Sequence, residues 1–282
     1  PMRRQPLSPA RLAWIALGLV AVLGRPALAA DETASSVGLR PLGGDWESGR
    51  TVGAGKWVIE GGLWAPVMDD PSILTGQIPS IPSAEDLDVY QRWQTLPAWP
   101  VVNGVYGLSD GNEAVLQLGP VVGGAYRRHF LRADAPWPNE YLQALIQLGG
   151  GFHLASFKPM GYVRIPAIYE RGAWTFHVGP GGYYLFNQQP IVDVQLGAEV
   201  RPLEGLHLGG MARLRMDAKR VTPTDGTWSF GGGARYQLGD RWSIQVEATR
   251  DNGPPLASDS IPLPVIEFPQ LGVRASVTYY HF

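Results

Sequence analysis

The chain has 282 residues, 45% of them hydrophobic, with 23 Lys and Arg against 25 Asp and Glu and a formal net charge of −2. A chain without a basic excess lacks the positive surface that binds nucleic acid by displacing counterions, so nucleic acid is not an expected partner. No cysteine is present, which excludes disulfides, thiolate metal sites and a lipid anchor on a cysteine.

The N-terminus resembles a secretory signal peptide. Three arginines precede an uncharged apolar stretch over residues 12–23, and residues 27–29 form the small-x-small signal Ala-Leu-Ala. The apolar stretch is short for a membrane-spanning helix, although an uncleaved anchor is an alternative. We expect residues 1–30 to be a signal peptide that is cleaved after Ala29 or Ala30.

The expected mature chain is more acidic than the whole. The leader holds four arginines and no acid, which leaves 19 basic and 25 acidic residues and a net charge of −6. No later stretch offers the roughly 20 consecutive apolar residues of a transmembrane helix. Any crossing of a membrane would therefore use β-strands.

Strict alternation of apolar and polar residues dominates the C-terminal half. Tight-turn sequences such as Gly239-Asp240 separate the alternating segments, as in β-hairpins. The five clearest segments are residues 192–200, 206–217, 228–238, 242–249 and 271–280.

Three features of the sequence favour a membrane barrel over a soluble sandwich or lipocalin-like barrel. Most of these segments are about 9–11 residues long, the length of a tilted membrane-crossing strand. Aromatic residues gather near the strand ends, as in an interfacial girdle. Those expected at the interface are Trp57, Trp64, Trp228, Tyr236, Trp242 and Tyr279.

The third feature is the placement of charge. Charged residues occupy only the polar alternation of the five segments, four basic against four acidic. Balanced charges in a small barrel are expected to pair across the lumen and fill it. The predicted lumen network is Asp193, Glu199, Arg213, Arg215, Asp217, Arg235, Glu247 and Arg274.

The N-terminal half alternates less regularly. It suggests six further strands, at residues 55–65, 98–108, 113–124, 141–155, 162–169 and 173–186. Gly119-Pro120 and Gly179-Pro180 fall inside two of them and predict bulges or bends, because proline cannot donate to a ladder. Barrels of this kind have even strand counts. We expect an antiparallel up-and-down barrel of 10–12 strands, with 12 preferred if residues 126–131 form another strand.

The predicted organisation has three parts. Residues 1–30 are the signal peptide, residues 31–50 an N-terminal periplasmic segment, and residues 51–282 the barrel. Two long proline-rich connections, at about residues 67–96 and 251–269, are expected to face outward, where such barrels keep their long loops.

Together, the leader, the alternating strands and the terminal aromatic residue resemble the outer-membrane β-barrel superfamily of Gram-negative bacteria. This resemblance over residues 50–282 is architectural, and no specific family matches by motif. It implies location in the outer-membrane lipid bilayer and recognition of the last strand by the barrel-assembly machinery. Tyr280 and Phe282 would form that signal.

The phase of this terminal signal is unusual. Phe282 shares its alternation with Tyr280 and the polar residues before it, whereas Tyr279 belongs to the apolar set. Either a bulge near Tyr279-Tyr280 switches the phase, or Phe282 does not face lipid.

Three functions fit this scaffold. The first is a non-enzymatic structural envelope protein or a narrow or plugged channel. The second is an outer-membrane hydrolase acting on lipid A or phospholipid, and the third is adhesion or partner docking through the long loops. The sequence does not indicate the oligomeric state.

The five histidines offer little support for an enzyme. His153 lies three residues from Ser156, which places the two side chains on opposite faces of a strand. His207 lies on the charged alternation and fits the lumen network. We expect no catalytic residue, cofactor or metal site, because the histidines are scattered singly.

Overall fold

The structure is a computed structural model that describes residues 41–42, 51–67, 98–119, 121–134, 140–154, 158–186, 190–218, 227–252 and 271–281. The expected signal peptide, Phe282 and nearly all of the two long connections lie outside these residues.

The described residues form thirteen β-strands in chain order. They are β1 (Trp57–Val67), β2 (Trp99–Ser109), β3 (Asn112–Leu118), β4 (Val121–Asp134), β5 (Glu140–His153), β6 (Lys158–Arg164), β7 (Ala167–Arg171), β8 (Trp174–Leu185), β9 (Ile191–Leu203), β10 (Leu206–Asp217), β11 (Thr227–Leu238), β12 (Trp242–Asn252) and β13 (Leu271–His281).

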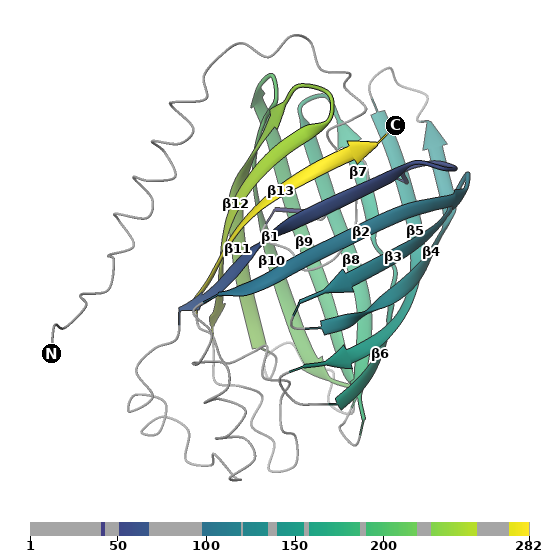
Figure 1. Cartoon of the computed structure of the whole chain (residues 1–282), viewed down its shortest axis with the longest axis vertical. Coiled ribbons are helices and arrows are strands. Elements are labelled where there is room, and N and C mark those ends of the chain that lie inside the picture. Colours follow the sequence, from purple (N-terminus) through teal and green to yellow (C-terminus); the bar gives the residue numbers. More distant parts are fainter. Residues whose placement is uncertain are drawn as a thin grey trace, which may run out of the picture.

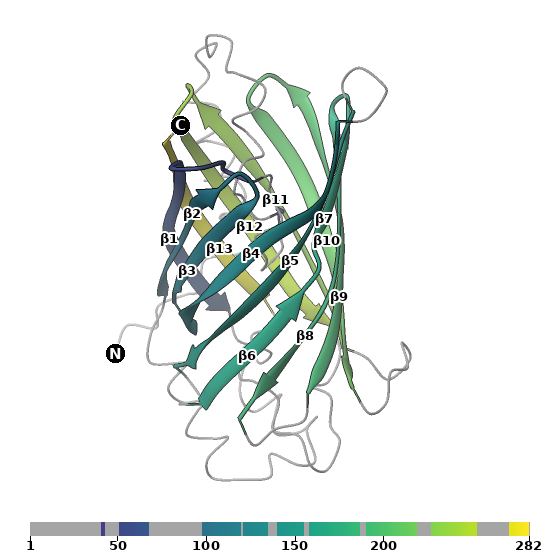
Figure 2. The same cartoon turned by 90° about the vertical axis from the view of Figure 1, so that its right-hand side faces the viewer.

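The sheet closes on itself. Neighbouring strands pair antiparallel around the ring, and β1 pairs with β13 from Trp57 opposite His281 to Val67 opposite Leu271. Figures 1 and 2 show the strands inclined around a single barrel. Closure leaves none of the described strands with an open edge, which is the condition for a β-structure to stand in lipid.

Thirteen strands fill twelve positions in the barrel wall. β6 and β7 are consecutive parts of one position, since both pair with β5 on one side and β8 on the other. The break falls at Ile165-Pro166, beside Pro180 of β8, where Ile165 N–H donates to Pro180 O at 2.9 Å. Pro180 has no N–H to return, so the ladder is interrupted there.

The fold class is as predicted, and 12 is the correct strand count. One detail of the prediction was wrong. Residues 113–124 are not one bulged strand, because β3 ends at Leu118 and β4 begins at Val121. At Gly179-Pro180 the register of β8 against β9 runs without a shift, and the interruption of the ladder falls on the β6/β7 side.

The strand order gives the barrel two different ends. The start of β1, the end of β13 and the short turns at 110–111, 172–173, 204–205 and 239–241 share one end, which we call the short-turn end. It carries the C-terminus in Figure 1. In bacterial barrels with both termini on one side, short turns face the periplasm.

The barrel has inverted polarity. Large apolar side chains such as Leu63, Phe130 and Leu196 are 57%, 62% and 51% exposed on its outer face. Charged and amide side chains such as Arg127, Glu113 and Gln147 are fully buried inside it. An apolar exterior around a polar interior is the arrangement of a barrel surrounded by lipid.

Among the described residues, no helix is both long and apolar enough to cross a bilayer.

Glycines make room for the large side chains of the lumen. A Cβ added to Gly209 would lie 2.6 Å from Glu199 Cγ, and one added to Gly149 would lie 2.2 Å from Tyr162 Cζ. In each pair the large side chain lies over the glycine of the adjacent strand. Glycines on one strand thus leave room for bulky lumen side chains of the next.

We predict that the protein fractionates with the outer membrane and migrates faster in gel electrophoresis before heating than after it. A closed hydrogen-bonded barrel resists detergent at room temperature and unfolds on boiling. Recovery in the soluble periplasmic fraction, with no heat-dependent shift, would contradict the membrane placement.

We also predict that Gly209→Ala lowers the free energy of unfolding by about 1 to 3 kcal/mol, because the methyl group overlaps Glu199. Gly61→Ala is the matched control, since nothing lies within 4 Å of its added Cβ. Urea unfolding in detergent measures both changes, and an equal effect would refute the packing argument.

Candidate functional site in the barrel lumen

Charged side chains inside the barrel form ion pairs between neighbouring strands. Arg213 donates from Nε and Nη2 to Asp193 Oδ2 at 3.0 and 2.6 Å. Arg127 Nη1 of β4 lies 3.3 Å from Glu113 Oε2 of β3. Arg274 Nη2 of β13 lies 2.9 Å from Glu60 Oε1 of β1. Pairing is required because an isolated buried charge costs several kcal/mol.

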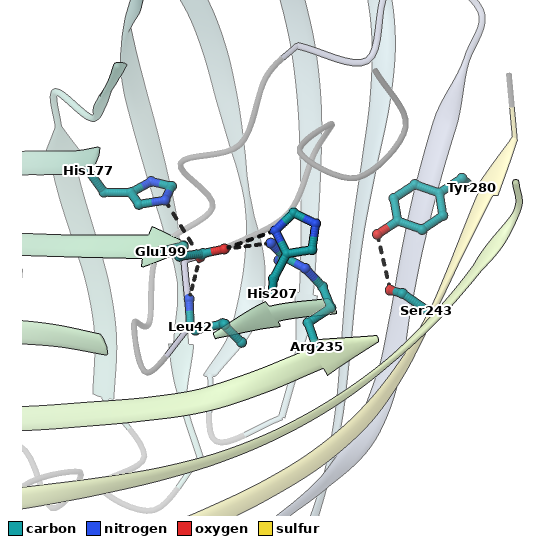
Figure 3. Close-up of polar contacts among 7 residues, drawn as sticks. All are labelled: Leu42, His177, Glu199, His207, Arg235, Ser243 and Tyr280. Atoms are coloured by element: carbon teal, nitrogen blue, oxygen red, sulfur yellow. Dashed lines mark hydrogen bonds and ion pairs between the residues drawn. The ribbon is translucent and has the colours of Figure 1, made fainter. Parts of the chain in front are cut away.

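Glu199 of β9 is the centre of a polar cluster in the lumen. Its Oε2 accepts from Arg235 Nη2 at 2.7 Å, and His207 Nδ1 lies 3.9 Å from the same atom. Its Oε1 lies 3.6 Å from His177 Nε2. Figure 3 shows these side chains converging on Glu199 from β8, β10 and β11.

The chain before β1 enters the lumen and reaches this cluster. Leu42 is 1% exposed, and its N–H donates to Glu199 Oε1 at 2.9 Å, a contact drawn in Figure 3. One carboxylate therefore holds both the barrel wall and the N-terminal segment, by which we mean the described residues 41–42 and 51–56.

A second contact of this segment is mainly hydrophobic. Val52 is buried against lumen-facing Val58, Val105, Val115 and Tyr280. Its N–H donates to Glu113, the partner of Arg127. Burying one valine side chain contributes about 1.5 to 3 kcal/mol. Val52 is therefore held both by the surrounding apolar side chains and by the carboxylate of Glu113.

Two glycines shape the path from Val52 to β1. Gly53 and Gly55 have φ of 81° and 73°, in the left-handed region that other residues rarely adopt. Gly55 N–H donates to Gly107 O at 2.8 Å and Gly107 N–H to Lys56 O at 2.9 Å. A Cβ on Gly107 would lie 1.7 Å from Gly53 O, so the segment lies directly against β2.

The structure places the predicted lumen charges as follows. Asp193, Glu199, Arg213, Arg215, Arg235 and Glu247 are buried, and Arg274 bonds to Glu60 inside the barrel. In the strand register Arg215 lies opposite Asp193, and Glu247 opposite Arg274. Asp217 belongs to β10, but its side chain lies outside the described part.

Five of the six predicted interfacial aromatics lie near the two ends of the barrel. Tyr279 contacts Trp57 and Trp242 with ring centroids 5.3 and 4.6 Å apart, on the outer face of the short-turn end. Tyr236 lies near the same end of β11. Trp228 lies toward the opposite end and stacks on Phe230 at 6.1 Å.

Trp64 corrects one prediction. It shares the alternation of buried Val58 and Glu60, and a Cβ added to lumen-side Gly272 would lie 2.7 Å from Trp64 Nε1. Its ring therefore covers a glycine inside the barrel. The irregular alternation of the N-terminal half hid which face of β1 was apolar.

The last strand contains no bulge in its described residues. Its pairing with β1 continues in register to His281. Tyr280 points inward and is 0% exposed. Its hydroxyl oxygen lies 3.1 Å from Ser243 Oγ. Phe282 and its role as an assembly signal lie outside the described residues.

His207 belongs to the Glu199 cluster, whereas the side chain of His153 lies outside the described part of the structure. His177 was missed, although its position on β8 alternates with outward Phe176 and Val178. Within the described ranges, no group of three or more His, Asp and Glu residues is arranged to hold a metal ion.

Glu60, Glu113 and Arg127 are lumen charges that were not predicted from the sequence. Glu113 and Arg127 stand directly opposite each other across the β3–β4 hairpin. An opposite-charge pair placed symmetrically about Gly119-Pro120 was the available signal, and reading residues 113–124 as one strand concealed it.

No protein-family model and no curated protein matches the chain. Among solved structures, a KdgM porin is similar with a TM-score of 0.46 and 8% identity over 79% of this chain and 98% of that one. A KdgM porin in complex with disordered oligogalacturonate gives 0.48 and 7% over the same shares. OprD from Pseudomonas aeruginosa gives 0.38 and 10% over 66% of this chain and 59% of its own. Likeness this distant says nothing about what this chain binds.

We predict that Glu199→Ala lowers the free energy of unfolding by about 3 to 5 kcal/mol, because Arg235 is left buried without its carboxylate. Exposed Glu204, in the turn after β9, provides the control: Glu204→Ala should change stability by less than about 0.5 kcal/mol. Urea unfolding in detergent compares the two, and equal losses would show that Glu199 is not a central ion-pair partner.

Proposed function

We propose that this protein is a non-enzymatic outer-membrane barrel whose lumen is closed by its own N-terminal segment, a plugged channel in its resting form. The observation that carries the proposal is the burial of that segment at two separate points, Leu42 against Glu199 and Val52 against the lumen valines.

Burial of the lumen side chains supports closure. Asp193, Ser243 and Thr278 are 0% exposed although they face the barrel interior. In an open, water-filled pore the wall side chains would be wet. Ion pairs across adjacent strands also neutralise the lumen, which removes the field that a strongly ion-selective pore requires.

The two attachments share one chemistry. Leu42 and Val52 each donate a backbone N–H to a lumen carboxylate, Glu199 and Glu113 respectively, and each buries an apolar side chain. Val52 also packs in a cluster of buried hydrophobic residues. A net hydrogen bond to a charged group is worth about 1.5 to 3 kcal/mol, and apolar burial adds to it at both points.

We predict low or no conductance for the whole protein in planar bilayers, and discrete openings for Val52→Asp. The new carboxylate would lie among valines beside Glu113, so the segment would leave its site. A variant in which the expected leader is joined directly to Gly53 should open in the same way.

Val52→Leu is the control, and its lumen should stay closed. Val122→Asp would not serve, because Val122 faces lipid. Large steady currents through the unmodified protein would overturn the plugged-channel proposal. Silent bilayers for both opening variants would mean that side chains alone close the lumen.

A further inference from the structure

An apolar groove of about 380 Å³ crosses the outer wall of the barrel over β5, β7, β8 and β9. It runs between two rows of outward side chains, with the strand backbone at Ile168, His177 and Gly197 between them. The rows are Leu142, Tyr169 and Phe176, and Ala167, Val178 and Leu196.

The groove owes its depth to one small residue. Ala167 begins β7 directly after the Pro166 break, and it pairs with Val178, which in turn pairs with Leu196. Its methyl group is the shortest side chain in the two rows. The space above it is open to the lipid-facing surface, because Phe176, Val178 and Leu196 are 44%, 42% and 51% exposed.

Aromatic rings border the groove toward the short-turn end. Trp174 is half-exposed and stacks on Phe176 with centroids 6.1 Å apart, and Phe176 stacks on Tyr169 at 6.3 Å. Tryptophan prefers the depth of the lipid head groups. The groove therefore begins just below the interface and extends into the hydrocarbon.

A cation stands at the interface end of this groove. Arg171 is exposed and lies opposite Trp174 in the register of β7 and β8. Glu170, the residue before it, alternates to the other face of the strand, and Glu140 of β5 lies opposite Arg171 in the register of β5 and β7. A guanidinium has five N–H donors, so it can bond a neighbouring carboxylate and also a phosphate joined to a hydrocarbon chain in the groove.

We propose that this groove binds one acyl chain of a phospholipid, with Arg171 facing the phosphate. The lining excludes a polar ligand, since burying unpaired polar groups there would cost free energy. The groove is continuous with the lipid-facing surface and lies in its short-turn half, so the lipid belongs to the periplasmic leaflet. This inference rests on the membrane placement of the barrel and not on the closure of its lumen.

The test is retention of phospholipid by the full chain after extraction in mild detergent, measured by native mass spectrometry. We expect the unmodified protein to keep one phospholipid and Ala167→Leu, which fills the groove, to keep about tenfold less, the equivalent of 1.4 kcal/mol. Ala234→Leu is the matched control, because Ala234 faces outward between Leu208 and Val246 on another part of the wall, and it should retain lipid normally.

Arg171→Gln separates a phospholipid from a free fatty acid, and it should lower retention of phospholipid several-fold. Equal retention by Ala167→Leu and Ala234→Leu, no retained lipid, or a fatty acid retained in place of phospholipid would each overturn the proposal. Conductance is measured separately and does not depend on Ala167, so the plugged-channel proposal can fail without this one.

Discussion

The pairing of β1 with β13 is the constraint on which the rest of the structure depends. Eleven register pairs join the two strands from Trp57–His281 to Val67–Leu271, and they bring together parts of the chain more than 200 residues apart. Closure satisfies the backbone without water, which permits an apolar exterior. The same closure confines every inward side chain to a narrow interior, so its charges must pair and its bulky residues must lie over glycines.

The N-terminal segment occupies part of the barrel interior. Leu42 and Val52 are both buried against side chains of the wall. Glu199 links the two, since it binds Arg235 of the wall and the N–H of Leu42. The valines around Val52 would be an apolar patch in a wet lumen, and their presence is explained by the residue that covers them.

The break between β6 and β7 connects the inner and outer features of the wall. Pro166 and Pro180 remove donors from the same place in the sheet, and the ladder resumes at Ala167. On the outside, Ala167 leaves the apolar groove. On the inside, the side chain of His177 lies beneath that groove and faces Glu199. The interrupted ladder thus lies beside both the outer groove and the Glu199 cluster.

The sequence by itself determined the fold class, the membrane placement and the identity of most lumen charges, because a period of two assigns each residue of β9 to β13 to one face. It could not assign β1 to β8 as well: glycines and prolines blur the alternation there, which misplaced Trp64 and hid the β3–β4 hairpin. Only the tertiary structure decided which charges meet and where the N-terminal segment lies. Those contacts depend on barrel closure and strand register, which bring Leu42 to Glu199 across 157 residues of chain, and no local pattern encodes such a distance.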